Sequence, residues 1–385
     1  MSPASKKVCI LGSKGSIANA HSLSASQFLD ACGKNTGNLL FQYACTKLFE
    51  GVSLGNIGHD IPYRHDHVNG KHEFLILPCA NFINPRFDMS GLVNYLKKVT
   101  IPIIPIGLGA QHESTSDGFP ELSSMPESIQ ELVGIFRLSS PKVFVRGEFT
   151  KTILVKYGVD EDRICVIGCP SNFIGDEVQM KAGFERCSKI EDDDISLLVT
   201  GDEVWPKNPA KREVEKQLVS LLLERGGGYL VQSVEPLVSN MMSSKSSKIS
   251  DEFCKILKQI GFKGLPEEPR SYLRLYDSVH SWMFGIRDIS FSTGLRLHGN
   301  MCSLQCGIPA VWIYHDSRTE ELCKIMALPC ISLKTASDHL ITGCYLSSVR
   351  DSAHEGLDHY LQIRARLRNE MLESLESIGI QLNRA

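Results

Sequence analysis

Short apolar runs alternate with longer amphipathic segments along the whole chain. The runs that predict strands are Lys6–Leu11, Glu73–Leu77, Ile101–Ile106, Lys142–Val145, a run from Ile164, Ser196–Val199, Tyr229–Gln232, Ile289–Phe291 and Ala310–Tyr314. Helical periodicity is found between them, at about 36–48, 89–98, 126–139, 210–225, 251–260, 271–286 and 319–327. Strands that alternate with helices are typical of parallel sheets. The pattern therefore predicts an α/β fold.

The length of the chain and one polar stretch predict two domains. A chain of 385 residues fits two domains of about 100–200 residues each. Residues 174–194 are polar and end in an acidic run, which is typical of a linker. We therefore predict an N-terminal domain at 1–185 and a C-terminal domain at 186–385. The second domain ends in a long, charged, amphipathic helix at about 353–378, and 241–250 is a polar loop.

Composition narrows the class of protein. With 42% hydrophobic and 22% charged residues, the chain is an ordinary globular protein, and its net charge of −3 argues against a broad nucleic-acid-binding surface. The thirteen cysteines are scattered without a Cys-x-x-Cys pair, which favours reduced thiols in a cytoplasmic protein. The run Val8–Leu11 is a strand and not a signal peptide, and no apolar run approaches the roughly twenty residues that span a bilayer.

Two polar segments invite other interpretations. The histidine-rich segment 59–72 suggests a metal, but a polar loop is the commoner explanation, and we predict no metal site. Residues 12–16 follow the first strand but lack both the Gly-x-Gly-x-x-Gly pattern and the lysine–serine pair of a phosphate-binding loop. We interpret them as a flexible loop.

The stretch 289–314 carries the clearest chemistry. Ser292, Thr293 and Gly294 are predicted to form the loop after the strand Ile289–Phe291, and a helix follows. Arg296, His298 and Asn300 then lie in its first turns, where free N–H groups and the helix dipole favour an anion. Arginine offers a planar fork for carboxylate or phosphate, and histidine exchanges a proton near neutral pH. The alternative is a solvent-facing arginine and a structural histidine.

This stretch resembles the polysaccharide pyruvyl transferase family. The matching motifs are Arg296-Leu297-His298-Gly299, Gly307-Ile308-Pro309 and the segment 314–318. The family often has a serine two residues before the arginine, where this chain has Gly294. Further matches are 33–44, which is otherwise a capped helix, the glycine-rich turn 107–112, and the Gly-Cys-Pro element at 168–170.

The resemblance implies a fold and an activity. The fold is two Rossmann-like domains that face a cleft, as in glycosyltransferases of the GT-B class. The activity moves the pyruvyl group of phosphoenolpyruvate onto two hydroxyls of one sugar, which forms a cyclic ketal and releases phosphate. His298 is then the general acid, Arg296 and Arg146 hold the carboxylate and phosphate, and the Leu297 main chain assists. Acceptor-binding candidates are Asn35, Asn38, Asn81, Gln111 and His112.

Several alternatives stay open. Arg146 could instead be a surface arginine that pairs with Glu148. A nucleotide-sugar-dependent glycosyltransferase would also use an arginine and a helix N-terminus, and a non-catalytic sugar-binding relative would keep the fold without the chemistry. The pyruvyl scheme needs no metal, nucleotide or cofactor. Its partners are phosphoenolpyruvate and a sugar or oligosaccharide acceptor, and a lipid-linked acceptor would be met at the inner membrane surface.

Overall fold

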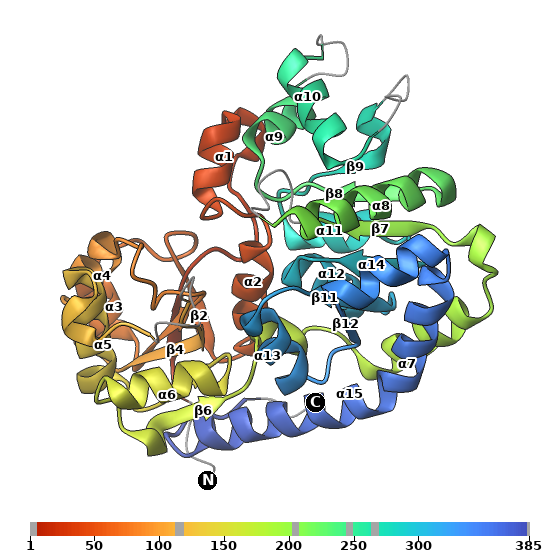
Figure 1. The fold of residues 1–385 in the computed structure, drawn as a ribbon. Helices are drawn as coiled ribbons and strands as arrows, with labels where there is room; N and C mark the ends of the chain where they lie inside the picture. Colours follow the sequence, from red (N-terminus) through yellow and green to blue (C-terminus); the bar gives the residue numbers. More distant parts are fainter. Residues whose placement is uncertain (1–5, 112–118, 202–207, 244–248, 263–268, 383–385) are drawn as a thin grey trace. The chain divides into compact units, whose positions relative to one another are not determined.

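The computed structural model describes residues 6–111, 119–201, 208–243, 249–262 and 269–382. The chain divides into two compact units, each of which contains one parallel sheet (Figure 1). The first unit comprises Met1–Lys14, Phe41–Ile174 and Ile363–Ala385, and the second comprises Gly15–Leu40 and Gly175–Gln362. The units are therefore not continuous in sequence, whereas the sequence predicted a single boundary at 185–186.

The first unit contains a six-stranded sheet in the order β2-β1-β3-β4-β5-β6, with every neighbouring pair parallel. Its strands are β1 (Val8–Leu11), β2 (Ser53–Ile57), β3 (Phe74–Pro78), β4 (Ile103–Leu108), β5 (Val143–Val145) and β6 (Ile164–Val166). Its helices are most of α2 (Asn38–Leu48), α3 (His65–Lys71), α4 (Ser90–Leu96), α5 (Glu127–Ser139) and α6 (Glu148–Lys156).

Both faces of this sheet are covered, which explains the continuous apolar strands. Val8 and Ile10 belong to one hydrophobic cluster, and Cys9 between them belongs to another. Since successive side chains of a strand point to opposite faces, the two clusters lie on opposite sides of the sheet. All residues of β3 and β4 are buried, as expected for parallel strands packed on both faces.

The second unit contains a six-stranded parallel sheet in the order β12-β11-β10-β7-β8-β9. Its strands are β7 (Leu197–Thr200), β8 (Gly227–Leu230), β9 (Leu273–Arg274), β10 (Phe291–Gly294), β11 (Ala310–Tyr314) and β12 (Cys330–Ser332). Its helices are α1 (Ala25–Ala31), α7 (Glu177–Ser188), α8 (Pro209–Arg225), α9 (Glu235–Met242), α10 (Asp251–Ile260), α11 (Val279–Gly285), α12 (Leu297–Gln305), α13 (Ser317–Ile325) and α14 (Leu333–Thr342).

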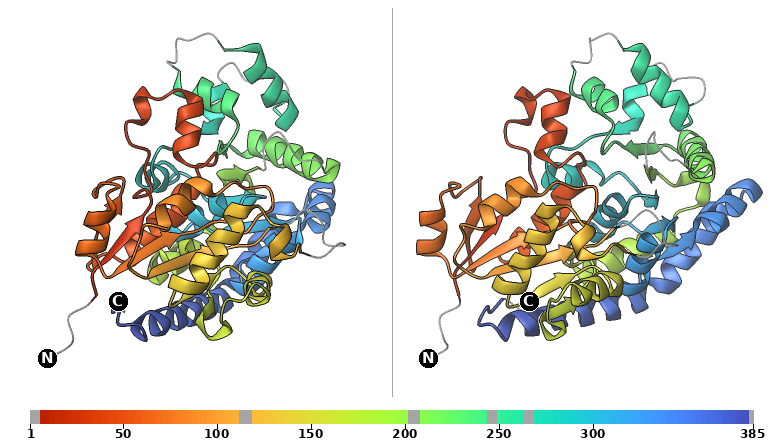
Figure 2. Two further views of the ribbon diagram at one scale, coloured as in Figure 1. Left: turned by 90° about the vertical axis from the view of Figure 1, so that its left-hand side faces the viewer. Right: turned by 60° about the vertical axis from the view of Figure 1, so that its left-hand side comes forward.

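The predicted α/β class, with two Rossmann-like parallel sheets, is confirmed. The predicted C-terminal helix is α15, a single helix from Tyr345 to Glu376 that starts earlier than expected (Figure 2). Its residues up to Gln362 belong to the second unit, and those from Ile363 belong to the first. The cleft that the resemblance implies stays a prediction.

Four local predictions are wrong. The expected linker at 174–194 contains α7, because Met180, Phe184 and Cys187 give it a buried face. The segment predicted as one helix at 271–286 contains β9 and then α11, whose N-cap is Ser278. Part of the expected loop at 59–72 forms α3. The expected loop at 241–250 contains the end of α9, and 244–248 lie outside the described residues.

A fifth correction concerns the expected loop Ser292–Gly294, which is part of β10. Its backbone pairs with β7 on one side and with β11 on the other. The two hydroxyls are fully buried and have partners: Ser292 Oγ donates to Asn300 Oδ1 at 2.9 Å, and Thr293 Oγ1 donates to the Val311 carbonyl at 3.1 Å. These internal hydrogen bonds remove the cost of burying polar groups.

Candidate active site

The N-terminus of α12 lies at the carboxyl edge of the second sheet, where parallel α/β sheets bind ligands. Strand β10 ends at Gly294, and Arg296 is the N-cap of α12, with an extended backbone. The amides of Leu295 and Arg296 both donate to the Thr200 carbonyl at the end of β7, at 2.8 and 3.1 Å. The connection between β10 and α12 is therefore held against the neighbouring strand.

A buried amide fixes the first turns of α12. Asn300 is fully buried, and its Oδ1 accepts from Thr200 Oγ1 and Ser292 Oγ, each at 2.9 Å. Its Nδ2 donates to the carbonyls of Gly294 and Val311, at 3.1 and 3.3 Å. Asn300 thus connects the helix to three strands. It is a structural residue here and not part of an exposed anion site.

The guanidinium of Arg296 is oriented by the ends of two other strands. Its Nε donates to the Gly201 carbonyl at 3.2 Å, directly after β7, and its Nη2 donates to Ser233 Oγ at 2.9 Å, shortly after β8. Arg296, Leu297 and His298 are all half-buried. The Leu297 carbonyl accepts from the Trp312 indole at 3.1 Å, so the side chain of β11 holds the main chain of this turn.

His298 packs against the turn Asn35–Gly37, which belongs to the same unit. A Cβ placed on Gly37 would lie 3.1 Å from His298 Cβ, so glycine permits this close approach. The turn is held by Gln232, whose carbonyl accepts from the Thr36 amide at 3.0 Å. Asn35 Oδ1 accepts from the Gly37 amide at 2.8 Å and from Gln232 Nε2 at 3.5 Å.

Four of the predicted site residues are thus brought together in the second unit: Asn35, Arg296, Leu297 and His298. Asn38 has a local role, since its Nδ2 donates to the carbonyls of Cys32 and Gly33. The sequence prediction missed Gly201, Gln232 and Ser233. Their position at or just after the ends of β7 and β8 is the signal that could have identified them.

The departure from the family pattern at Gly294 has a steric reason. Gly294 has φ +143°, and a Cβ on it would lie 2.4 Å from the Thr200 carbonyl oxygen. A serine does not fit here unless β7 and β10 separate. The hydroxyls of Ser292 and Thr293, which could have replaced that serine, are directed into the protein interior by the hydrogen bonds described above.

Three further predicted residues come together in the first unit. Arg146 follows β5, Asn81 follows β3 and Gln111 follows β4. Arg146 Nη1 donates to Asn81 Oδ1 at 3.2 Å, and Asn81 Nδ2 donates to Gln111 Oε1 at 3.0 Å. Arg146 is only 7% exposed and lies over the Phe41 ring, so it is not a surface arginine. His112 lies outside the described residues.

The surroundings of Cys79 and Asp316 shift the pKa of each side chain and so decide whether it is charged near neutral pH. Burial raises the pKa of the Cys79 thiol well above its ordinary value, although Arg146 opposes the shift, so this cysteine stays protonated. Burial would also raise the pKa of Asp316, but Arg318, the Thr319 amide and His315 outweigh it and hold that pKa below the ordinary 3.8. Asp316 is therefore an anion near neutral pH.

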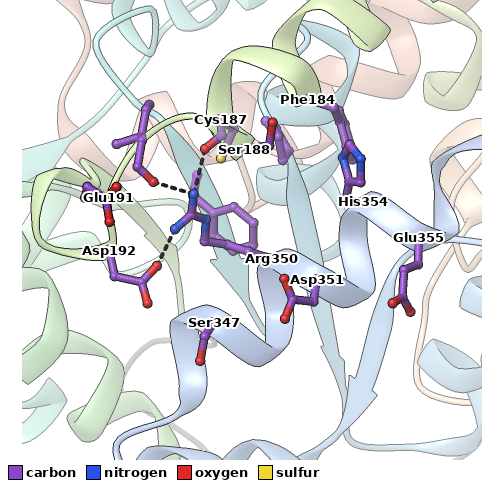
Figure 3. Close-up of a pocket in the computed structure, with 13 residues that line it drawn as sticks. Phe184, Cys187, Ser188, Glu191, Asp192, Ser347, Arg350, Asp351, His354 and Glu355 are labelled. Atoms are coloured by element: carbon purple, nitrogen blue, oxygen red, sulfur yellow. Dashed lines mark hydrogen bonds and ion pairs between the residues drawn. The ribbon is translucent and has the colours of Figure 1, made fainter.

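A cavity of about 490 Å³ lies in the second unit between α7 and α15 (Figure 3). Its lining includes Phe291, which begins β10, and Pro309, which precedes β11. It therefore lies at the edge of the sheet opposite to Arg296. The Arg350 side chain pairs with Asp192 and donates to the carbonyls of Cys187 and Ile190, which are carbonyls at and just after the C-terminus of α7.

The described part of the chain contains neither a cluster of metal ligands nor a helix suited to cross a membrane. No group of three or more histidine, cysteine, aspartate or glutamate side chains there could hold a metal ion. None of the described helices combines the length and apolar character that a membrane crossing requires.

Comparison with known proteins gives a family match. The family model described as polysaccharide pyruvyl transferase matches residues 35–317, which is more than half of the chain. No curated protein matches the chain. Among solved structures, the chain is similar to Anabaena Alr3699/HepE in complex with UDP, with a TM-score of 0.49 and 9% identity over 96% of this chain and 100% of that one.

A second similar structure is the UDP-GlcNAc 2-epimerase from Neisseria meningitidis bound to UDP-GlcNAc. Its TM-score is 0.46, with 9% identity over 96% of this chain and 100% of that one. The wall teichoic acid polymerase TagF gives a TM-score of 0.42 and 10% identity over 97% of this chain and 90% of that one. At such values these likenesses carry no inference about what this chain binds.

Proposed function

Because the chain belongs to the polysaccharide pyruvyl transferase family and is a pyruvyltransferase, we propose that its donor is phosphoenolpyruvate. The product is a cyclic ketal on two hydroxyls of one sugar residue of a polysaccharide, glycan or precursor, and phosphate is released. The observation that supports this most is the joint placement of Arg296 and His298 in the first turn of α12, at the carboxyl edge of the sheet. Parallel α/β sheets generally bind ligands at this edge.

His298 is proposed as the general acid. It transfers a proton to the methylene carbon of phosphoenolpyruvate, which becomes a methyl group, and the neighbouring carbon becomes an oxocarbenium centre. A sugar hydroxyl attacks that centre and returns its proton to the histidine. A general acid at a fixed position typically contributes 10²–10⁴-fold to a rate. The close contact with Gly37 supports a fixed position for His298.

The second half of the reaction expels phosphate. The bond between the central carbon and the phosphate oxygen breaks, and its electron pair leaves with the phosphate. The second sugar hydroxyl attacks the oxocarbenium centre so formed, gives its proton to the departing phosphate, and closes the ketal ring. No electron is exchanged with an outside reagent, so this scheme needs no redox cofactor, and none of its steps requires a metal or a nucleotide.

Arg296 is proposed to hold an anionic group of the donor. A guanidinium binds a carboxylate or phosphate through parallel hydrogen bonds, and its charge stabilises the departing phosphate. The Leu297 main chain is proposed to assist at the helix start. Arg146 is the second proposed anion-binding residue, and its amide neighbours Asn81 and Gln111 support a polar binding function.

The residues proposed to bind the acceptor sugar are chosen because their side chains are polar. Asn35, Asn38, Asn81, Gln111 and His112 are the candidates for binding sugar hydroxyls. The acceptor is a sugar or oligosaccharide, free or carried on a lipid. A lipid-linked acceptor would place the enzyme at the cytoplasmic membrane surface.

The test is turnover with a defined donor. Purified protein is incubated with phosphoenolpyruvate and a panel of galactosides, glucosides and mannosides, and phosphate release and product mass are followed. We expect one acceptor to gain a pyruvyl group with release of phosphate, and His298→Ala to abolish it. The control is His359→Ala, which changes an exposed histidine on α15 and should leave turnover intact.

The opposing result is equally specific. If the protein does not bind phosphoenolpyruvate but transfers a sugar from a nucleotide sugar to the same panel, the donor assignment is wrong. If it binds acceptor sugars without any turnover, and His298→Ala leaves that binding unchanged, the non-catalytic alternative is favoured.

A further inference from the structure

Two consecutive residues just after β8 contact both parts of the candidate site. Ser233 Oγ accepts from Arg296 Nη2, and Gln232 holds the turn Asn35–Gly37 that packs against His298. We propose that the Gln232–Ser233 dipeptide positions the two catalytic side chains. Ser233 acts on Arg296 directly, and Gln232 acts on His298 through the turn. This inference rests on the proposed function for the roles of Arg296 and His298.

The contact to Arg296 sets the plane of its guanidinium. Gly201 O and Ser233 Oγ accept from Nε and Nη2, at 3.2 and 2.9 Å. Two acceptors on different nitrogens fix the rotation of a planar group, whereas one acceptor does not. A fixed plane matters because bidentate recognition of a carboxylate or phosphate depends on the direction of the fork. The Gly201 contact is made by the main chain, so Ser233 is a side chain whose replacement tests how this direction is set.

The contact to His298 depends on close packing. Gln232 is 1% exposed, and its carbonyl accepts from Thr36 while its side chain reaches Asn35. A Cβ on Gly37 would lie 2.7 Å from Gln232 Nε2 and 3.1 Å from His298 Cβ. The turn therefore fits between Gln232 and His298 without spare room, so a change in Gln232 displaces the surface on which His298 rests.

The two residues should give different kinetic signatures. Ser233→Ala releases the group that binds the donor anion, so we expect the KM for phosphoenolpyruvate to rise about tenfold, as for loss of one hydrogen bond to a charged group. We expect kcat to change by less than about twofold. Ser233→Thr keeps the hydroxyl and should restore the KM.

Gly37→Ala instead moves the general acid. A displacement of this kind can cost about 10²-fold in rate, so we expect kcat to fall at least tenfold, with a smaller change in KM. Gln232→Met replaces the amide with a side chain of similar volume and should show the same kcat loss. The two variants act on one turn by independent changes, so failure of one to fold leaves the other as the test.

The control for these variants is Ser220→Ala. Ser220 is a half-buried serine on α8 whose Oγ donates to the Lys216 carbonyl at 3.1 Å, and its loss should leave kcat and KM unchanged. Trp282 and Trp312 are both buried in the second unit. Their fluorescence in urea therefore reports the stability of the second unit for every variant.

A readout that needs no turnover separates this inference from the proposed function. In protein labelled with ¹⁵N-arginine, the Nε–H signal that disappears in Arg296→Lys is that of Arg296. We expect its hydrogen exchange to be slow in the wild type and in Ser233→Thr, and at least tenfold faster in Ser233→Ala. If wild-type protein does not transfer pyruvate from phosphoenolpyruvate, the proposed function fails, and this exchange still decides whether Ser233 positions Arg296.

Two results would overturn the inference. One is that exchange at Arg296 is the same in Ser233→Ala and the wild type. The other is that Ser233→Ala and Gln232→Met lower the same kinetic parameter in proportion to their loss of stability, as purely structural changes would.

Discussion

Replacing Asn300 should destabilise the second unit more than its small side chain suggests. Asn300→Ala removes four hydrogen bonds, all made by buried groups: from Thr200 and Ser292 hydroxyls, and to the carbonyls of Gly294 and Val311. Each buried hydrogen bond contributes about 1 kcal/mol net, and a buried polar group left without a partner costs about 1–3 kcal/mol.

Two of the four losses are softened by neighbours. Thr200 Oγ1 can turn to the Thr293 carbonyl at 3.4 Å, and the Val311 carbonyl still accepts from Thr293 Oγ1 at 3.1 Å. The hydrogen bonds of Ser292 and Gly294 are lost in full, and those of Thr200 and Val311 in part. Together these losses give a decrease of about 3–5 kcal/mol in the free energy of unfolding. Asn300→Asp should cost at least as much, because a carboxylate cannot donate to the two carbonyls.

The assay is urea denaturation followed by tryptophan fluorescence, which reports the second unit because Trp282 and Trp312 are buried in it. The matched control is Asn208→Ala, which removes one exposed N-cap hydrogen bond to Ala210 at 2.9 Å and should cost about 1 kcal/mol. If Asn300→Ala costs no more than Asn208→Ala, then Asn300 does not hold α12 to the sheet and the account of the site is refuted.

Three further predictions concern the same unit. Gly294→Ser should lower the free energy of unfolding by about 2–5 kcal/mol and gain no activity, because its Cβ would lie 2.4 Å from the Thr200 carbonyl oxygen. A variant that is stable in the same fluorescence assay and more active in turnover would contradict this. Arg350→Ala should lower the free energy of unfolding by about 2–3 kcal/mol, since it removes contacts to Asp192 and two carbonyls (Figure 3). The control Lys324→Ala breaks an exposed pair with Glu320 and should lower it by less than about 0.5 kcal/mol. Equal losses would show that Arg350 does not secure α7. The pKa of Asp316 is lowered, so its ionised form stabilises the fold above the ordinary pKa of 3.8, and this stability is lost as the pH falls through and below 3.8. In a pH series of unfolding midpoints, Asp316→Asn should therefore be less stable than wild type near neutral pH, and the difference should shrink below about pH 4. A constant difference would refute the linkage.

The sequence predicted the fold best where strands are covered on both faces. Such strands are continuous apolar runs, and the central strands of both sheets were identified in this way. The strands that were missed, β2, β9 and β12, all lie at sheet edges, where one side has no neighbouring strand and the apolar pattern is shorter. The polar residues of β10 were misread as a loop because their partners, Asn300 and Val311, are known only from the structure.

Only the part of the candidate site that depends on local sequence could be predicted. Arg296 and His298 follow a strand directly, so their position at the sheet edge can be inferred from local sequence. Chain order placed the turn Asn35–Gly37 in the N-terminal domain, but the hydrogen bond from Thr36 to the Gln232 carbonyl joins it to the second sheet. The partner of such a turn is almost two hundred residues away in sequence, and no local pattern indicates it.

The two arginines differ in a way that predicts different roles. Both lie at the carboxyl edge of a parallel sheet, and both donate to main-chain carbonyls, of Cys79 and of Gly201. Arg146, however, is only 7% exposed and is joined to Asn81, whereas Arg296 is half-buried and is held by a hydroxyl. A buried arginine already bound to an amide acts on a ligand chiefly by orienting that amide and by its charge. Direct contact with a donor anion is therefore expected first of Arg296, which also stands next to the proposed acid.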